Sequence, residues 1–315
     1  MAGEKKRVFS GIQPSGKPHI GNYFGALRQW VEMAGEYDCT YCIVDYHALT
    51  TVRDAAALRE NIIETAKDLL AIGIDPAQVT LFKQSDVPEH TELAWVFETL
   101  VTVPFLQQAH AYKDKVAKGL EANAGLFNYP MLMAADILLY DTQVVPVGED
   151  QRQHVEYARE AAAKFNHAYG QTFTEPEEMI LENVGVVPGT DGKKMSKSYG
   201  NTIPLFGTKD EIAKAVMSIV TDSSGERPEN VYQIHKLFRT EAELEILYTT
   251  NKGNYKALKE ALIEDIETFV APMRERRTSL TDDQVKKTLT EGGEKARAIA
   301  SSRMADVRKK VGVSL

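Results

Sequence analysis

Apolar residues in the first two thirds of the chain form short runs that alternate with stretches of helical pattern. Four runs are bounded by turn residues and are expected to be strands: Arg7–Gly11, Thr40–Val44, Val79–Phe82 and Val144–Val147. Short apolar runs of this kind are typical of parallel strands buried on both faces. Strands separated by helices imply right-handed crossovers, so the expected fold class is α/β with a doubly wound parallel sheet. Such a sheet binds its ligand at the carboxyl ends of its strands.

Two helices are predicted near the first strands. The first begins near Ile20 and runs to Ala34. The second begins after Asp54, which can cap it, and ends at Gly73. Its apolar face consists of residues at helical spacing: Leu58, Ile62, Ala66, Leu69 and Leu70.

The last third of the chain has a wholly helical pattern. Three segments begin with a capping box, at Thr208, Thr240 and Thr281. A further helix, disturbed at Pro272, is predicted from an apolar stripe: Leu258, Leu262, Ile266, Phe269 and Met273.

The length of 315 residues fits one large or two modest domains. The change of pattern predicts an α/β domain over residues 1–205 and a C-terminal helical domain over residues 206–315. The net charge of −8 argues against a nucleic acid partner, but the charge is unevenly distributed. Residues 205–315 carry 19 Lys and Arg against 18 Asp and Glu, whereas the first 204 carry 18 against 27.

Two short basic runs lie in the helical part, Arg274–Arg277 and Arg308–Lys310. They fit a solvated helix face as well as an RNA-binding surface. Charge therefore permits an RNA partner without indicating one.

The chain contains only two cysteines, Cys39 and Cys42, which excludes a disulfide framework and fits a reducing compartment. Two cysteines cannot close a tetrahedral metal site, so packing is the better interpretation and no metal site is expected. The N-terminal residues lack the apolar run of a signal peptide, and no apolar stretch is long enough to span a membrane. We expect a cytoplasmic protein.

A segment rich in glycine and proline, Ser10–Asn22, joins the first strand to the first helix. The N-terminus of a helix presents unpaired N–H groups and attracts phosphate. His19 and Asn22 add donors there, and Gly21 lacks the Cβ that would keep a flat base away from the backbone. This junction is a candidate nucleotide site.

A second segment, Gly192–Ser198, places two lysines three residues apart in a Gly/Ser loop. Lys194 and Lys197 can reach one triphosphate from a mobile loop, although such a loop alone is usually a solvated turn. In an adenylate-forming reaction a carboxylate attacks the α-phosphorus and pyrophosphate leaves. Catalysis is then mainly positioning and charge stabilisation, without a side-chain nucleophile or base.

Together, His19–Asn22 and Lys194–Ser198 resemble the paired signatures of class I aminoacyl-tRNA synthetases. The family usually ends its first signature in histidine, and this chain has Asn22, which can still donate. The resemblance implies a Rossmann-like catalytic domain with a helical insertion at about residues 105–128. It also implies that residues 206–315 bind the tRNA anticodon.

Three further stretches resemble the tryptophanyl-tRNA synthetases of bacteria. They are FSGIQPSG with HIGNYFGAL (residues 9–27), NYPMLMAADILLY (128–140) and VPVGEDQRQH (145–154). The resemblance implies that tryptophan and ATP with Mg²⁺ give tryptophanyl-adenylate and pyrophosphate, and that tryptophan is then transferred to tRNA(Trp). It also implies a homodimer in which the tRNA crosses both subunits.

The chemistry of residues 128–140 agrees with a tryptophan site. Pro130 is expected to start a helix on which Met133 and Asp136 share a face. Methionine suits an aromatic ring, and a carboxylate can accept the hydrogen bond of a buried indole N–H. Alternatively, Asp136 is a helix carboxylate satisfied by a neighbour.

The resemblance gives further residues a role in binding tryptophan. It implies that Asp136 takes the indole N–H and that Phe9 and Met133 pack on the ring. Tyr129, Gln151 and Gln13 would hold the ammonium or carboxylate group. His47 follows the second strand and would line the pocket, but a structural histidine is an equal alternative.

The resemblance also implies two sets of residues at the ATP site. The catalytic set is Lys194, Lys197, His19, Asn22 and Lys115. The ATP-binding set is Gln13, Pro14, Ser15, Gly21, Asn22, Gly148, Glu149, Asp150, Val187, Lys194, Met195, Ser196, Lys197 and Ser198. Two of these assignments have an alternative without a role in ATP binding. Gly148–Asp150 also fits an ordinary acidic first turn of a helix, and Lys115 also fits a surface lysine.

Three other functions are compatible with parts of the pattern. A tyrosyl-tRNA synthetase shares the architecture, but the SGIQPSG and GEDQ contexts argue against it. A small-molecule adenylyltransferase explains the first signature but not the lysine loop or the helical tail. A non-catalytic RNA-binding relative would be expected to lose Asp136 or the catalytic lysines, all of which are present.

Overall fold

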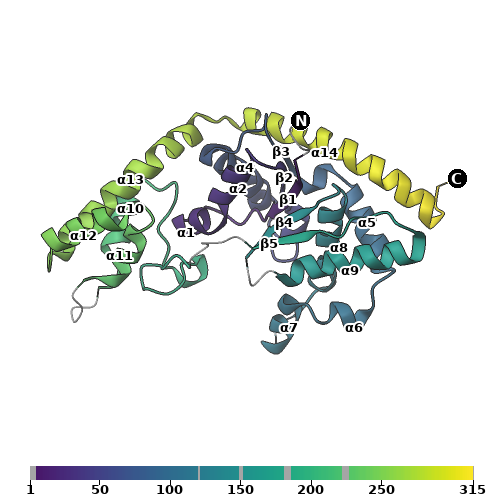
Figure 1. Ribbon diagram of the computed structural model, residues 1–315, viewed down its shortest axis with the longest axis horizontal. Coiled ribbons are helices and arrows are strands. Elements are labelled where there is room, and N and C mark those ends of the chain that lie inside the picture. The colour runs from purple at the N-terminus through teal and green to yellow at the C-terminus, as the bar shows by residue number, and fades with distance from the viewer. Residues whose placement is uncertain (1–4, 120, 149–151, 181–185, 222–226, 315) are drawn as a thin grey trace.

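A computed structural model gives the fold of the chain (Figure 1). It describes residues 5–119, 121–148, 152–180, 186–221 and 227–314. The central feature is a five-stranded parallel sheet in the order β3-β2-β1-β4-β5. Its strands are β1 (Arg7–Ile12), β2 (Asp38–Ile43), β3 (Thr80–Lys83), β4 (Val144–Val147) and β5 (Glu177–Ile180). The predicted α/β class and the doubly wound parallel sheet are confirmed.

The sequence pattern located four of these strands to within two residues at either end, but it missed β5. This edge strand reads Glu-Glu-Met-Ile and none of its side chains is fully buried, so it lacks an apolar run. Its pairing with β4, Val144 opposite Glu177, holds it in the sheet.

Helices cover both faces of the sheet and continue beyond it (Figure 1). Within the first 180 residues they are α1 (Ile20–Asn22), the π-helical turn η1 (Tyr23–Leu27), α2 (Arg28–Met33), α3 (Asp45–Ala48), α4 (Ala55–Ile72), the 3₁₀ turn η2 (Gln84–Asp86), α5 (Glu89–Glu98), α6 (Val103–Leu106), α7 (His110–Ala117), α8 (Ala124–Leu138) and α9 (Arg152–Tyr169). Further along are the 3₁₀ turn η4 (Lys197–Tyr199), α10 (Lys209–Met217), α11 (Glu229–His235), α12 (Glu241–Thr250), α13 (Tyr255–Ser279) and α14 (Asp282–Val311). None of the described helices combines the length and apolar character needed to cross a bilayer.

The predicted helix ends are confirmed where a capping side chain was the signal. Asp54 accepts hydrogen bonds from two backbone N–H groups of α4, and Gly73 ends that helix at φ 114°. The capping boxes at Thr208, Thr240 and Thr281 all form.

Two prolines behave differently from their sequence interpretation. The helix that Pro130 was expected to start begins six residues earlier, because Asn123 caps α8 through the N–H of Leu126. The helix α13 likewise continues through Pro272. Met133 and Asp136 nevertheless lie on one helix, as predicted.

Two hydrophobic clusters fill the two faces of the sheet. Cys39 belongs to one and Cys42 to the other, and both are buried free thiols. Residues three apart on a strand point to opposite faces, so the two cysteines pack as expected and do not form a pair.

The helix α14 lies along β3 at the edge of the sheet (Figure 1). Val285 and Leu289 pack into the cluster on one face, while Ala300 and Met304 pack into the other. At the crossing point Gly292 approaches the carbonyl oxygen of Leu81 so closely that a Cβ would lie 1.8 Å from it. The end of the chain is therefore packed onto the α/β core.

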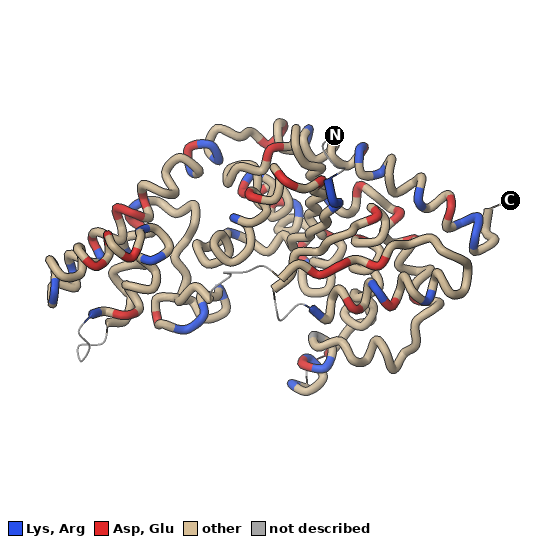
Figure 2. Tube along the Cα trace, viewed as in Figure 1, with Lys and Arg blue, Asp and Glu red and all other residues tan. Residues whose placement is uncertain are grey.

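Figure 2 shows where the charged residues lie along the trace, and three side chains of the two basic runs bond to that core. Arg276 donates to the carbonyl oxygen of Ala71 at 2.8 Å. Arg308 donates from Nε to Oε1 of Glu92 at 2.7 Å. Lys310 donates to the carbonyl oxygen of Gln171, also at 2.7 Å. These three side chains therefore serve contacts within the chain.

Candidate active site

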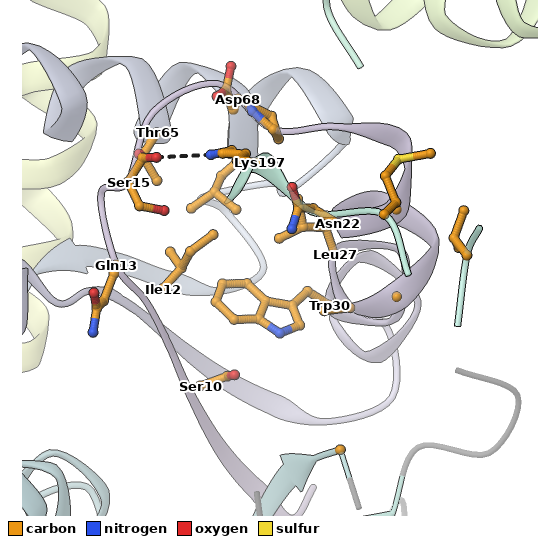
Figure 3. Close-up of a pocket in the computed structure, with 18 of the residues that line it drawn as sticks. Ser10, Ile12, Gln13, Ser15, Asn22, Leu27, Trp30, Thr65, Asp68 and Lys197 are labelled. Carbon is orange, nitrogen blue, oxygen red and sulfur yellow. Dashed lines mark hydrogen bonds between the residues drawn. The ribbon is translucent and has the colours of Figure 1, made fainter. Parts of the chain in front are cut away.

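A cavity of about 1030 Å³ opens at the carboxyl end of β1 (Figure 3). Ser10–Gln13 lines one side, and Pro146 and Gly148, at the end of β4, line another. The lysine loop closes it through Lys194, Met195 and Lys197. The two segments singled out in the sequence thus share one cavity.

Backbone contacts hold these two segments together. Ile20 N–H donates to the carbonyl oxygen of Ile203 at 3.0 Å, and Leu205 N–H donates to that of Pro18 at 3.1 Å. The ammonium of Lys197 reaches across and donates to the carbonyl oxygen of Ser15 at 2.9 Å (Figure 3). It also donates to the carbonyl oxygen of Gly16 at 3.0 Å. Because these acceptors are neutral carbonyls, a phosphate oxygen is a stronger partner for the same lysine.

His19 and Asn22 cap each other at the start of α1. The Asn22 N–H donates to Nδ1 of His19 at 3.2 Å, and the His19 N–H donates to Oδ1 of Asn22 at 3.1 Å. Burial, with the nearby charge of Lys197, lowers the pKa of His19 to about 4, so the ring is neutral at pH 7. With Nδ1 accepting, the proton sits on Nε2, and each residue keeps one donor: Nε2–H of His19 and the amide NH₂ of Asn22.

Asn201 organises the lysine loop, a role that the sequence interpretation missed. Its side chain is buried and accepts from the N–H of Ser196 at 2.8 Å. Its amide donates to Oδ1 of Asp191 at 2.7 Å and to the carbonyl oxygen of Lys194 at 3.1 Å. An asparagine three residues beyond the last signature serine was the available signal.

The predicted ATP-site residues divide into three groups. Those that line the cavity are Gln13, Ser15, Gly21, Asn22, Gly148, Val187, Lys194, Met195 and Lys197. Those outside its lining are Pro14, His19, Lys115, Ser196 and Ser198. Glu149 and Asp150 lie outside the described residues, as does Gln151 of the predicted tryptophan set.

Gly21 lines the cavity and has two close neighbours in the protein. A Cβ at this position would lie 2.9 Å from Nδ1 of His19 and 3.2 Å from Cβ of Met195. The missing side chain lets the lysine loop approach the start of α1, so it serves the contact between the two segments.

Four cavity residues from α2 and α4 were not predicted as site residues: Trp30, Thr65, Asp68 and Leu69. Asp68 is buried, and it is paired with Arg277 of α13 at 2.6 Å. Burial raises the pKa of Asp68 to about 6, although Arg277 and Lys197 lower it and Glu64 adds to the rise. Trp30 is a core residue and stacks on Tyr41, whereas Trp95 is 66% exposed and is not part of the core.

A second polar cluster surrounds Asp136, which is 1% exposed. Its Oδ2 lies 2.9 Å from Nε2 of His47. Its Oδ1 lies 2.6 Å from both Nε2 of Gln84 and Nδ1 of His90. Burial would raise the pKa of Asp136, but the two histidines outweigh it and hold the pKa well below its usual range. The carboxylate is therefore anionic and oriented.

Three more residues predicted to bind tryptophan, Phe9, Tyr129 and Met133, lie around this cluster. The Phe9 ring is stacked on Tyr140 at 5.6 Å, and the Tyr129 ring meets His47 edge-on at 6.2 Å. Met133 is half-buried against the same hydrophobic cluster as Phe9. Gly11 links this region to the cavity, because it lines the cavity and a Cβ there would lie 2.9 Å from Val44 and 3.9 Å from Phe9.

A family model described as tRNA synthetases class I (W and Y) matches residues 1–298. The chain therefore belongs to the class I tRNA synthetases of this group. Within the group, the chain is 48% identical over 318 residues to a tryptophan–tRNA ligase of Rhodopirellula baltica, which covers 98% of this chain and 99% of that protein.

Solved structures agree with this placement. The crystal structure of tryptophanyl-tRNA synthetase from Campylobacter jejuni, complexed with ADP and tryptophan, has a TM-score of 0.92 at 43% identity and covers 97% of this chain and 99% of that one. A tyrosyl-tRNA synthetase from Archaeoglobus fulgidus, complexed with L-tyrosine, has a TM-score of 0.66 at 18% identity, with coverage of 88% and 91%, and shares the fold. The resemblance to tryptophanyl-tRNA synthetases seen in the sequence is confirmed.

Proposed function

We propose that this chain is a ligase that activates tryptophan with ATP and then transfers it to tRNA(Trp). The observation that carries the proposal is the shared cavity, in which Lys197 reaches from the lysine loop to the carbonyls of Ser15 and Gly16. The tryptophan–tRNA ligases to which the chain is 48% and 47% identical support the choice of amino acid.

Activation needs the tryptophan carboxylate in line with the α-phosphorus of ATP. The carboxylate oxygen forms the new bond to phosphorus as the bond to pyrophosphate breaks, and no proton has to move. Lys194 and Lys197 stabilise the charge on the leaving phosphates, and Lys197 exchanges its two carbonyl acceptors for phosphate oxygens. Nε2–H of His19 and the amide of Asn22 donate to the same phosphates.

The other ATP contacts follow from the cavity lining and the family. Gln13, Ser15, Gly21, Gly148 and Val187 face the nucleotide. Five more residues complete the proposed set: Pro14, Glu149, Asp150, Ser196 and Ser198. Lys115, on α7, is proposed as a further phosphate ligand that reaches the site when ATP is bound. In this proposal Mg²⁺ enters with ATP, as part of the substrate complex.

Asp136 accepts the indole N–H of tryptophan in this proposal, and Phe9 and Met133 pack on the ring. Tyr129, Gln13 and Gln151 hold the ammonium or carboxylate group. His47 acts through Asp136, because it donates to Oδ2. An anionic acceptor suits indole, whose nitrogen can only donate.

We also propose the assembly that the family implies. A homodimer binds tRNA across both subunits, with residues 206–315 of one subunit reading the anticodon and residues 1–205 of the other charging the acceptor end. Trp95 and Val103, 66% and 60% exposed, offer apolar surface for the second copy. The two buried thiols fit a cytoplasmic location.

The test is amino-acid-dependent exchange of pyrophosphate into ATP, with tryptophan and tyrosine measured side by side, followed by charging of tRNA(Trp). We expect exchange and charging with tryptophan alone. Exchange with tyrosine would make the chain a tyrosine enzyme. Pyrophosphate exchange without charging of tRNA(Trp) would support the adenylate step and contradict the proposed transfer to tRNA.

A further inference from the structure

The two carboxylate oxygens of Asp136 accept different numbers of hydrogen bonds within the protein. A carboxylate offers about two positions on each oxygen. Oδ1 meets both Gln84 Nε2 and His90 Nδ1 at 2.6 Å, so both of its positions are taken. Oδ2 meets His47 Nε2 at 2.9 Å and keeps one position.

His90 is held on its other side as well. Its ring is fully buried, and Nε2 lies 2.7 Å from the hydroxyl of Tyr140. The ring of Phe82 stacks beside it at 5.9 Å. The carboxylate accepts the hydrogen bond of Nδ1–H, and Nε2 is hydrogen-bonded to the Tyr140 hydroxyl. A chain of hydrogen bonds therefore runs from Tyr140 through His90 to Asp136.

We propose that His90 and Tyr140 are positioning residues for tryptophan specificity, because they saturate Oδ1 of Asp136 and leave Oδ2 to receive the indole N–H. The inference rests on the proposed role of Asp136. It adds that the choice of amino acid depends on two residues that need not touch the substrate. Tyr140 also forms the surface on which Phe9 stacks, so one residue orients both the acceptor and the ring that packs on indole.

The substrate pair that tests this inference differs only at the indole nitrogen. Tryptophan donates an N–H, whereas 3-benzothienylalanine has sulfur in that position and nearly the same shape. The ratio of kcat/KM for the two, measured by pyrophosphate exchange, reports the hydrogen bond to Asp136. A bond to a charged group predicts a preference of about tenfold to a hundredfold for tryptophan in the unaltered protein.

Two substitutions at His90 form a matched pair. In His90→Asn the amide nitrogen stands near the position of Nδ1 and still donates to Asp136. In His90→Gln the longer side chain reaches toward Tyr140 and the donor to Asp136 is lost. We expect His90→Gln to lower the preference for tryptophan about tenfold and His90→Asn to keep most of it, with KM for ATP unchanged in both.

Tyr140→Phe removes only the hydroxyl and serves as the second measurement if His90→Gln fails to fold. It should lower the preference about threefold. The positioning role would be overturned if every folded variant kept the original preference for tryptophan. It would also be overturned if kcat/KM fell equally for tryptophan and 3-benzothienylalanine. The absence of any preference in the unaltered protein would instead remove the proposed role of Asp136 itself.

Discussion

Arg277 of α13 donates from Nε to Oδ1 of Asp68 at 2.6 Å, and this bond joins a C-terminal helix to a carboxylate that lines the cavity at the end of β1. The same guanidinium donates to Glu64 at 2.5 Å and lies 5.3 Å from the ring of Phe206, which follows the lysine loop. One side chain thus ties together α13, α4 and the segment after the loop.

Arg277→Ala should destabilise the protein by about 3 kcal/mol, because it leaves a buried carboxylate without its charged partner. The double variant Arg277→Ala with Asp68→Asn should recover part of that loss, since the unpaired charge is removed as well. Urea unfolding of the three proteins measures the effect. Additive losses in the double variant would contradict the pairing.

The pKa of Asp68 predicts a pH dependence of stability. Burial raises this pKa from 3.8 to about 6, so between these values the folded protein holds a proton that the unfolded chain releases. The free energy of unfolding should therefore fall by up to about 3 kcal/mol as the pH rises from about 4 to about 6. The difference in free energy of unfolding between the original protein and Asp68→Asn, measured against pH, isolates the contribution of this carboxyl group. If the two proteins lost stability in parallel over this pH range, the raised pKa of Asp68 would be refuted.

Lys197→Ala should slow tryptophan-dependent pyrophosphate exchange about a hundredfold or more, because it removes a cation from the charge growing on the phosphates. The affinity for tryptophan should change little. The control is Lys193→Ala, an exposed lysine in the same loop that does not line the cavity. Equal effects of the two substitutions would argue against a specific role for Lys197.

Two substitutions at His19 separate its structural and catalytic contributions. His19→Ala should lose the cap and about 1 kcal/mol of stability, whereas His19→Asn keeps a capping acceptor. Both lose the Nε2–H donor, so both should slow exchange about tenfold to a hundredfold. Because the pKa of His19 is about 4, its titration should leave the exchange rate constant from pH 6 to 8. Exchange by His19→Asn at the original rate would show that the donor is not used.

The sequence was sufficient to predict those elements whose structure depends on residues close together in the chain. The strand Val144–Val147 and the helix cap at Thr208 were each predicted from a few adjacent residues, and both form as predicted. Asp68, Gln84 and His90 could not be assigned in this way, because their roles depend on partners from distant parts of the chain. His90 meets Asp136 only because α5 packs against α8.

A local sequence signal for a helix start also failed where a stronger capping residue lay nearby. Pro130 is a good first residue of a helix, yet the side chain of Asn123 caps an earlier turn and α8 begins there. The pairing of the signature segments was predictable in outline from the family resemblance. The reach of Lys197 to two backbone carbonyls was not, because it depends on the three-dimensional course of the loop.

Gly292→Ala tests the contact between α14 and the sheet. An added methyl would lie 1.8 Å from the carbonyl oxygen of Leu81, and the shift this requires outweighs the gain of about 0.5–1 kcal/mol that alanine brings to a helix. We expect a net loss of about 2 kcal/mol in thermal or urea unfolding. The neighbouring Gly293→Ala, whose methyl would lie 3.0 Å from Cβ of Asp86, should cost less, and the reverse order would contradict the packing.

The position of α14 also has a consequence for the fate of the chain during synthesis. The strand β3 is one of the two outer strands of its sheet, and an uncovered outer strand can recruit a strand from another molecule. Until the ribosome has released Asp282–Val311, the outer edge of that strand lacks the helix that covers it. Nascent or proteolytically shortened chains should therefore be the forms that aggregate, and they should do so through Thr80–Lys83.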